Sequence, residues 1–120
     1  MPTREIVEAF AARLEAGDFL TAIEQFYAPD AATYENTAEP TVGRDKLAAK
    51  ERGVLAAFKA VKAVRMGPSL IDGDHVATRW QFSFTSAEGT TRILDEIAWQ
   101  TWRGNKLVEE RFYYDPKQVR

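Results

Sequence analysis

The hydrophobic pattern of this chain changes period near Val61. Before that residue, apolar side chains recur every three or four positions, which is the spacing of one face of a helix. After it, apolar and polar residues alternate, as they do along a strand with one buried face. Helices that come first in the sequence must then cover one face of an antiparallel meander. We therefore expect an α+β fold with three N-terminal helices on a strongly curved antiparallel sheet.

Capping and turn residues set the bounds of the expected helices. A first helix runs from Thr3 to Gly17 and a second from Asp18 to Pro29. The stretch 32–45 reads as loop and short strand, and a third helix begins at about Asp45. Gly53 within that helix suggests a close approach to the sheet. The buried stripe of the second helix is expected to contain Phe19, Leu20, Ile23, Phe26 and Tyr27.

Four strands follow, separated by short turn signals. They are expected over residues 61–66, 75–86, 91–102 and 106–114. No Ser/Gly-rich linker, repeat or low-complexity tract divides the chain. Its 120 residues suffice for one core and are too few for two, so we expect a single domain over residues 1–120.

The last turn decides which strand residues face the helices. A three-residue loop of Arg103, Gly104 and Asn105 pairs Trp102 with Lys106 and places the even-numbered residues of both strands on the inner face. A two-residue turn at Gly104 and Asn105 pairs even residues with odd ones and breaks this assignment. We take the first register as the working hypothesis.

Composition excludes several kinds of chemistry. Sixteen basic and eighteen acidic residues give a net charge of −2, which leaves no cationic surplus for a nucleic-acid partner. With no cysteine and one histidine, His75, we expect neither a metal site nor any other cofactor. No apolar segment is long enough to span a membrane and the N-terminus is charged, so a cytoplasmic location is expected. Catalysis, if present, must use carboxylates, tyrosines and amides.

Several strings in this order resemble one family. They are Y-A-x-D-A at Tyr27 to Ala31, G-R-D at Gly43 to Asp45, D-G-D at Asp72 to Asp74, and a final W-R-x-x-K-L-V-E strand. Together they are similar to the SnoaL-like proteins of the nuclear-transport-factor-two-like superfamily, over roughly Ile6 to Asp115. The resemblance implies a cone-shaped fold with an internal pocket and frequent dimerisation through the sheet.

Known chemistries of that superfamily do not transfer intact. The position of the ketosteroid isomerases' general base matches Asn36, and that of their proton-donating aspartate matches Ala98. The Tyr-x-Asn pair that holds water in the limonene-epoxide hydrolases matches Tyr34 and Asn36. Their charged Asp-Arg-Asp set, however, matches three aromatic residues here, Trp80, Phe82 and Phe112. The scytalone dehydratases rely on histidines, and one histidine is too few.

The inner face still holds two carboxylates. In the working register Glu96 and Glu110 are diagonal neighbours, about 7 to 8 Å apart at their backbones. Burial and mutual repulsion raise one pKa and leave a protonated acid beside an ionised base. The competing interpretation is that either carboxylate faces solvent or pairs with Arg92 or Arg111.

Other residues complete a candidate site. Tyr34 is expected to orient the substrate with Asn36, although Asn36 could instead simply hold a turn. The expected pocket wall contains Trp80, Phe82, Phe112 and Tyr114, residues that could equally be plain core. His75 begins a strand and reads as structural. Ile97 and Trp99 on the outer face favour a homodimer.

These residues lead to two hypotheses about function. The first is a cofactor-free isomerase, cyclase, dehydratase or hydrolase that acts on a mainly apolar small molecule, such as a polyketide, steroid or terpenoid. Catalysis is assigned to Glu96, Glu110 and Tyr34, and ligand binding to Asn36 and the aromatic wall. The second is a non-catalytic ligand-binding or dimerisation module with the same fold.

Overall fold

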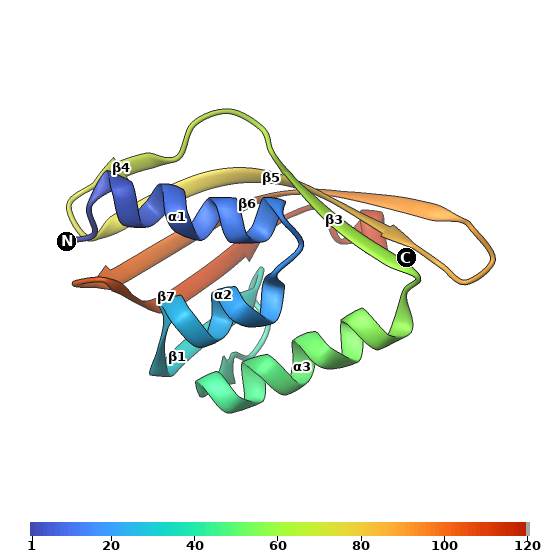
Figure 1. Ribbon diagram of the computed structural model, residues 1–120, viewed down its shortest axis with the longest axis horizontal. Coiled ribbons are helices and arrows are strands. Elements are labelled where there is room, and N and C mark those ends of the chain that lie inside the picture. Colours follow the sequence, from blue (N-terminus) through green and yellow to red (C-terminus); the bar gives the residue numbers. More distant parts are fainter. Residues whose placement is uncertain (120) are drawn as a thin grey trace.

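Three helices pack on one side of a curved sheet in the computed structural model, which describes residues 1–119 (Figure 1). The helices are α1 (Arg4–Glu15), α2 (Phe19–Phe26) and α3 (Arg44–Ala57). All three precede the long strands in sequence, as the change of hydrophobic period predicts. The α+β fold class is thus confirmed, with the sheet mixed rather than wholly antiparallel.

Local chemistry sets both ends of α1, but Asp18, the expected cap of α2, makes no side-chain capping hydrogen bond. The Thr3 side chain caps α1 by accepting a hydrogen bond from the Ile6 backbone nitrogen at 3.2 Å. Gly17 follows the helix with a φ of 82°, a conformation that favours glycine. The second helix ends at Phe26, earlier than Pro29 suggests, because Tyr27 is already extended.

Seven strands form the sheet, in the order β2-β1-β7-β6-β5-β3 with β4 paired to β5. Their bounds are β1 (Tyr27–Glu35), β2 (Thr41–Val42), β3 (Ala60–Arg65), β4 (Leu70–Asp72), β5 (His75–Thr85), β6 (Thr91–Arg103) and β7 (Lys106–Tyr113). Strands β3, β5, β6 and β7 are the four that the alternating pattern predicts. Strand β5 pairs with β4 near its start and with β3 over its second half.

Strand β1 begins at Tyr27, within the segment expected to be helical, and is longer than the short strand expected over residues 32–45. It runs parallel to β7, and Thr33 stands beside Glu110. The pairing is irregular between Tyr27 and Ala32, where Pro29 has no N–H to offer a ladder. The proline therefore lies in an irregular stretch of a strand and does not end a helix.

The last hairpin also differs from the prediction. Its turn contains two residues, Gly104 and Asn105, because Arg103 pairs with Lys106. A bulge at Val108 then shifts the register, so that Gln100 faces Glu110. The extra residue restores the pairing of even with even positions that a two-residue turn alone would break. The expected loop is wrong, and the expected inner face is retained.

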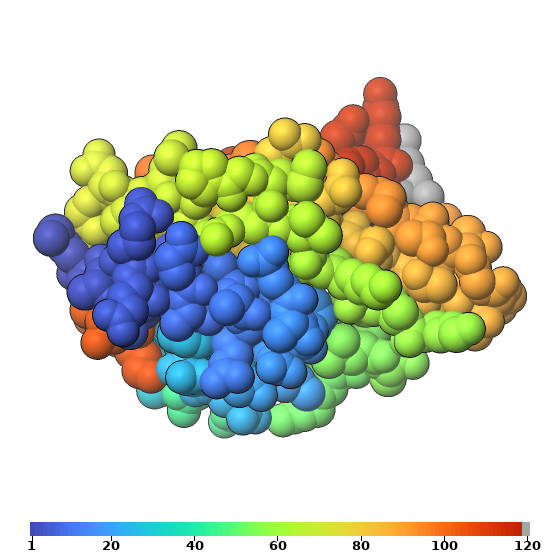
Figure 2. All heavy atoms as spheres, turned by 45° about the horizontal axis from the view of Figure 1, so that its top comes forward, coloured from blue at the N-terminus to red at the C-terminus, as the bar shows by residue number. Residues whose placement is uncertain are grey.

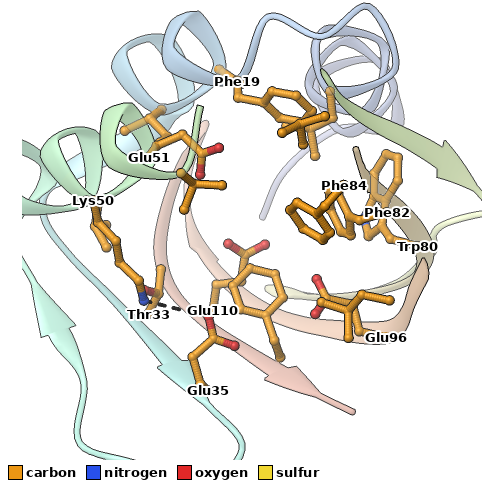
Figure 3. Close-up of a pocket in the computed structure, with 18 of the residues that line it drawn as sticks. Phe19, Thr33, Glu35, Lys50, Glu51, Trp80, Phe82, Phe84, Glu96 and Glu110 are labelled. Atoms are coloured by element: carbon orange, nitrogen blue, oxygen red, sulfur yellow. Dashed lines mark ion pairs between the residues drawn. The ribbon is translucent and has the colours of Figure 1, made fainter. Parts of the chain in front are cut away.

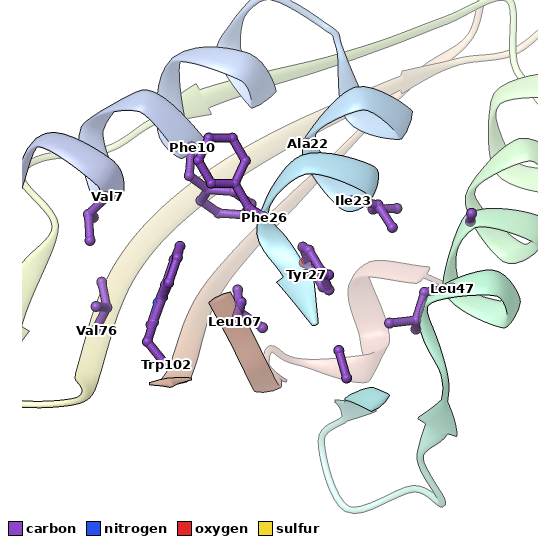
Figure 4. Close-up of a cluster of buried hydrophobic side chains, with 12 residues drawn as sticks. Val7, Phe10, Ala22, Ile23, Phe26, Tyr27, Leu47, Val76, Trp102 and Leu107 are labelled. Atoms are coloured by element: carbon purple, nitrogen blue, oxygen red, sulfur yellow. The ribbon is translucent and has the colours of Figure 1, made fainter. Parts of the chain in front are cut away.

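The buried apolar residues form two clusters where one was expected. Around Phe10 lie Phe26 and Trp102, both edge-on to its ring with centroids 5.5 and 5.9 Å away (Figure 4). Trp80 belongs to the second cluster, and half-buried Phe58 belongs to neither but packs on Phe84. Leu14 packs against both clusters.

The long axis of the molecule, 43 Å, follows β5 and β6. Their connecting turn extends past the helices and appears in orange in the space-filling view (Figure 2). The 3₁₀ turn η1 (Pro116–Val119) packs on β6, where the Gln118 side chain hydrogen-bonds both the backbone nitrogen and the carbonyl of Asp95. Gly53 lies exposed with open space around it, so it does not mark a close helix–sheet approach. Within residues 1–119, no helix has the length and apolar character needed to cross a membrane.

Candidate functional site

A cavity of about 280 Å³ lies between the helices and the inner face of the sheet (Figure 3). Most of its wall is apolar, with aromatic rings from α2, β5 and the end of β7. The predicted ligand-binding residues Trp80, Phe82, Phe112 and Tyr114 all line it, as do both predicted catalytic glutamates, Glu96 and Glu110.

Glu110 lies at the floor of this cavity and is 2% exposed. The Tyr27 hydroxyl donates a short hydrogen bond to its Oε1, and the Gln100 amide donates to its Oε2 at 2.6 Å. The indole N–H of Trp102 donates in turn to Gln100 Oε1 at 3.0 Å. Because an indole nitrogen can only donate, this contact fixes the orientation of the Gln100 amide. Both carboxylate oxygens of Glu110 are therefore held as acceptors.

The pKa of Glu110 reflects a balance of opposing effects. Burial raises it to about 7, while the hydrogen bonds from Tyr27 and Gln100 favour the charged form and lower it. Burial and the nearby Glu110 charge also raise the pKa of Tyr27 well above its usual value, so the phenol remains a donor. Near neutral pH, Glu110 is consequently present in both protonation states.

Glu96 stands opposite Trp80 on β5 and is 6% exposed. Within residues 1–119 its carboxyl makes no hydrogen bond or ion pair. Its oxygens are open to the cavity, into which Figure 3 shows them pointing. Burial raises its pKa to about 8, with smaller contributions from the charges of Glu35 and Glu110. The pKa values of both carboxyls thus lie well above the ordinary range of a glutamate.

The two glutamates are not the diagonal neighbours that the working register predicts. Gln100 is the partner of Glu110, and Glu96 lies four residues further along β6. At about 3.3 Å per residue, the two backbones are offset by roughly 13 Å along the strands. Both carboxyls line the same cavity, but at separate positions along its wall. A ligand can therefore lie between them.

Tyr34 and Asn36 do not line the cavity, contrary to the role assigned to them. The guanidinium of Arg111 lies over the Tyr34 ring, 4.1 Å from its centroid. Asn36 has a φ of 51°, and its side-chain oxygen accepts a hydrogen bond from the Tyr114 backbone nitrogen at 3.0 Å. It therefore holds a turn. Because β1 pairs in parallel with β7, Thr33 and Glu35 face inward beside Glu110 and Phe112.

Several lining residues escaped the sequence interpretation. Tyr27 was expected in the buried stripe of a helix, and Glu35 was assigned no role. Glu51 lines the cavity from α3, and its pKa is raised by burial. A signal for it exists in the sequence, since Glu51 lies four residues after the inward-facing Leu47. Lys50, the neighbour of Glu51 on α3, also lines the cavity, and its Nζ forms an ion pair with Glu35 Oε1 at 3.7 Å.

His75 lies outside the site, as its position at a strand start suggests. Its ring stacks on Trp99 with centroids 5.1 Å apart, on the exposed face of the sheet. Nδ1 lies 3.3 Å from the Thr101 hydroxyl. Histidine therefore has no part in the chemistry of the cavity.

Comparison with known proteins agrees with this geometry. A sequence model of the SnoaL-like domain family matches residues 7–110. A crystal structure from Mesorhizobium loti, of a protein classed with the SnoaL-like polyketide cyclases, shares 31% identity at a TM-score of 0.76. The alignment covers 92% of this chain and 97% of that one. No curated protein matches.

Two further solved structures share the fold at lower identity. One, from Pseudomonas putida, is classed as a polyketide cyclase and is 19% identical at a TM-score of 0.78, covering 99% of this chain and 96% of that one. The other, from Catenulispora acidiphila, has a ketosteroid isomerase-like fold and was solved with trimethylamine. It is 20% identical at a TM-score of 0.79, covering 96% of this chain and 88% of that one.

Proposed function

This chain belongs to the SnoaL-like domain family, and we propose that within it the protein is a cofactor-free acid–base enzyme acting on a small, mainly apolar molecule. The family binds small molecules, and the relative from Mesorhizobium loti is classed with the polyketide cyclases. An isomerisation, a cyclisation or a dehydration would each require one proton removed from the substrate and one returned.

The observation that carries the proposal is a pair of buried carboxyls that face one cavity, of which Glu110 accepts two hydrogen bonds and Glu96 accepts none from the described chain. Glu110, at about 7, is the base, since its oxygens are held as acceptors by Tyr27 and Gln100. Glu96, at about 8, is the acid and hydrogen-bonds the electronegative atom of the substrate. A base and an acid separated in this way can act at opposite ends of a conjugated segment.

In this mechanism the apolar wall has two functions. Trp80, Phe82 and Phe112 hold the hydrocarbon part of the substrate and exclude water from it. Exclusion of water also keeps the carboxyl pKa values high, because a solvated Glu96 would ionise near its ordinary value. Tyr27, and not the expected Tyr34, is the phenol at this site, and it donates to the base.

The proposal can be tested without knowing the natural substrate. The α-protons of 2-tetralone, a flat apolar ketone, exchange with deuterium in D2O, and proton NMR follows the rate. We expect the protein to accelerate exchange above the buffer rate, and Glu110→Gln to abolish the acceleration while 2-tetralone still binds. Glu96→Gln should slow exchange, and Glu109→Gln on the outer face should not. Binding without accelerated exchange would favour the non-catalytic binding module.

The proposal includes a homodimer through the outer sheet face. Ile97, Trp99 and Tyr113 lie there and are 40%, 44% and 49% exposed. A second copy would cover these apolar side chains by an isologous contact. The cytoplasmic location stays a prediction of the sequence.

A further inference from the structure

The cavity has an unbalanced set of charged side chains. Four carboxyls line it, from Glu35, Glu51, Glu96 and Glu110, against the single cation of Lys50. That cation is already paired, because Lys50 Nζ lies 3.7 Å from Glu35 Oε1. No arginine belongs to the described lining. An anionic ligand would therefore find no unpaired positive side chain and several negative ones.

Two of these carboxyls lack a protein partner. Within the described chain, neither Glu96 nor Glu51 takes part in a hydrogen bond or an ion pair, whereas both oxygens of Glu110 accept hydrogen bonds. Glu96 is the more constrained because it is 6% exposed and is directed into the cavity (Figure 3). Glutamate is almost never buried without a partner, since removing it from water costs free energy. The oxygens of Glu96 open on the cavity, so they are within reach of a ligand there.

Aromatic rings make up much of the remaining wall. They come from Phe19, Tyr27, Trp80, Phe82, Phe84, Phe112 and Tyr114. The face of an aromatic ring is electron-rich and attracts a cation, and this attraction is strongest where water is excluded. Rings and unpaired carboxyls around one cavity are the combination by which proteins recognise an ammonium group.

We propose that the substrate is a mainly apolar molecule carrying a protonated or quaternary nitrogen, which pairs with Glu96 inside the aromatic wall. This inference rests on the proposed function and identifies the substrate group that Glu96 faces, for which the ionised Glu96 is the counter-ion. When a neutral amine binds, the Glu96 proton passes to its nitrogen, which leaves an ammonium beside a carboxylate. When a quaternary ammonium binds, the same proton is released to solvent. The charges balance in both cases. Glu110 remains the base and, because Glu96 is ionised in this complex, it also returns the proton to the substrate.

The test compares two molecules of the same shape and different charge. Choline and its carbon isostere 3,3-dimethylbutan-1-ol are titrated into the full chain by calorimetry at pH 7, in buffers of different ionisation enthalpy. We expect choline to bind at least about tenfold more tightly than the neutral isostere. We also expect choline, but not the alcohol, to release protons on binding, so that its affinity rises from pH 6 to pH 9.

Variants assign the effect to one carboxyl. Glu96→Gln keeps the size of the side chain and should remove both the preference for choline and the proton release, with 3,3-dimethylbutan-1-ol binding unchanged. Glu109→Gln removes an exposed carboxyl from the opposite face of the same sheet and should change neither. A thermal unfolding curve verifies that both variants are folded.

Three results would overturn the inference: no detectable choline binding, equal binding of choline and the alcohol, or an unchanged preference in Glu96→Gln. Any of these together with intact deuterium exchange in 2-tetralone would refute the cationic substrate and leave the acid–base proposal standing. The opposite combination, a Glu96-dependent preference for choline without exchange, would support the ligand class and refute the catalysis.

Discussion

Gln100 and Glu110 are register partners on β6 and β7, and the Gln100 amide nitrogen donates to Glu110 Oε2 at 2.6 Å. The amide cannot turn around without giving up the hydrogen bond from Trp102, whose indole only donates. A buried tryptophan thus determines which atom of a neighbouring side chain meets the candidate base. The hydrogen bond from Gln100 keeps the pKa of Glu110 below the value that burial alone would give.

Replacement of Gln100 by leucine should raise the pKa of Glu110 above about 7, because the carboxylate loses a donor. The Trp102 indole would also lose its acceptor, so we expect a loss of about 1 to 3 kcal/mol in unfolding free energy. Carbon-13 NMR titration of the glutamate carboxyls measures the pKa, and urea unfolding measures the stability. Gln81→Leu, outside this network on β5, serves as the control. An unchanged Glu110 pKa would contradict the assigned hydrogen bond.

Loss of the Tyr27 hydroxyl should act in the same direction. Tyr27→Phe keeps the ring against Phe10 and removes only the donor to Glu110 Oε1. We expect a higher Glu110 pKa in the same titration and slower deuterium exchange in 2-tetralone at pH 7, because less of the base is ionised. Tyr113→Phe, on the exposed face, should leave both quantities at the wild-type values. If Tyr27→Phe behaved like Tyr113→Phe, the phenol would have no part in tuning the base.

Stability should fall as the pH rises through neutrality. Glu96 and Glu110 have pKa values of about 8 and about 7 in the folded chain, against an ordinary value of 4.5 that applies to the unfolded chain. Between about pH 4.5 and about pH 8 the folded state therefore binds more protons than the unfolded state. Their favourable contribution is therefore complete below about pH 4.5 and is lost progressively up to about pH 8. Urea unfolding from pH 5 to pH 9 should show the decline.

The matched variants identify the source of that decline. Glu96→Gln cannot ionise, so its unfolding free energy should fall less steeply with pH than that of the wild type, and the difference between them should grow up to about pH 8. Glu109→Gln should follow the wild-type curve. Parallel curves for the wild type and Glu96→Gln would mean that Glu96 titrates near its ordinary value.

The proposed homodimer makes a further prediction. Trp99→Glu places a charge in the apolar patch with Ile97 and Tyr113 and should convert a dimer to monomers in light scattering at micromolar concentration. Val42→Glu alters an equally exposed apolar residue on the two-residue strand β2, away from this patch, and should leave the dimer intact. A wild-type chain that scatters as a monomer would exclude the dimer.

Much of this architecture follows from short-range patterns. The Thr3 cap, the glycine after the first helix and the alternation along β5 and β6 each depend on neighbouring residues, and each prediction made from them is confirmed. The inward direction of Glu96 also follows from alternation along β6, because successive side chains of a strand point to opposite faces. That of Glu110 depends in addition on the bulge at Val108. Local physics suffices for these features.

The arrangement of the site depends on contacts between distant segments. Strand β1 exists because β7, more than seventy residues later, offers a parallel edge, and this pairing turns Thr33 and Glu35 inward in place of Tyr34 and Asn36. No alternating pattern in residues 27–35 distinguishes that outcome from a loop. For the same reason Tyr27 could not be recognised as the donor to Glu110.

The register of the last hairpin gives the clearest physical reason for this division. One extra residue at Val108 shifts the pairing of everything beyond it, and the sequence carries no mark of where a bulge forms. The offset between Glu96 and Glu110, the partnership of Gln100 with Glu110 and the unpartnered state of Glu96 all depend on that shift. Sequence alone determined which residues could do chemistry here, through composition and alternation. Only the tertiary structure decided which of them meet and which remain without a partner, because pairing and desolvation depend on the whole fold.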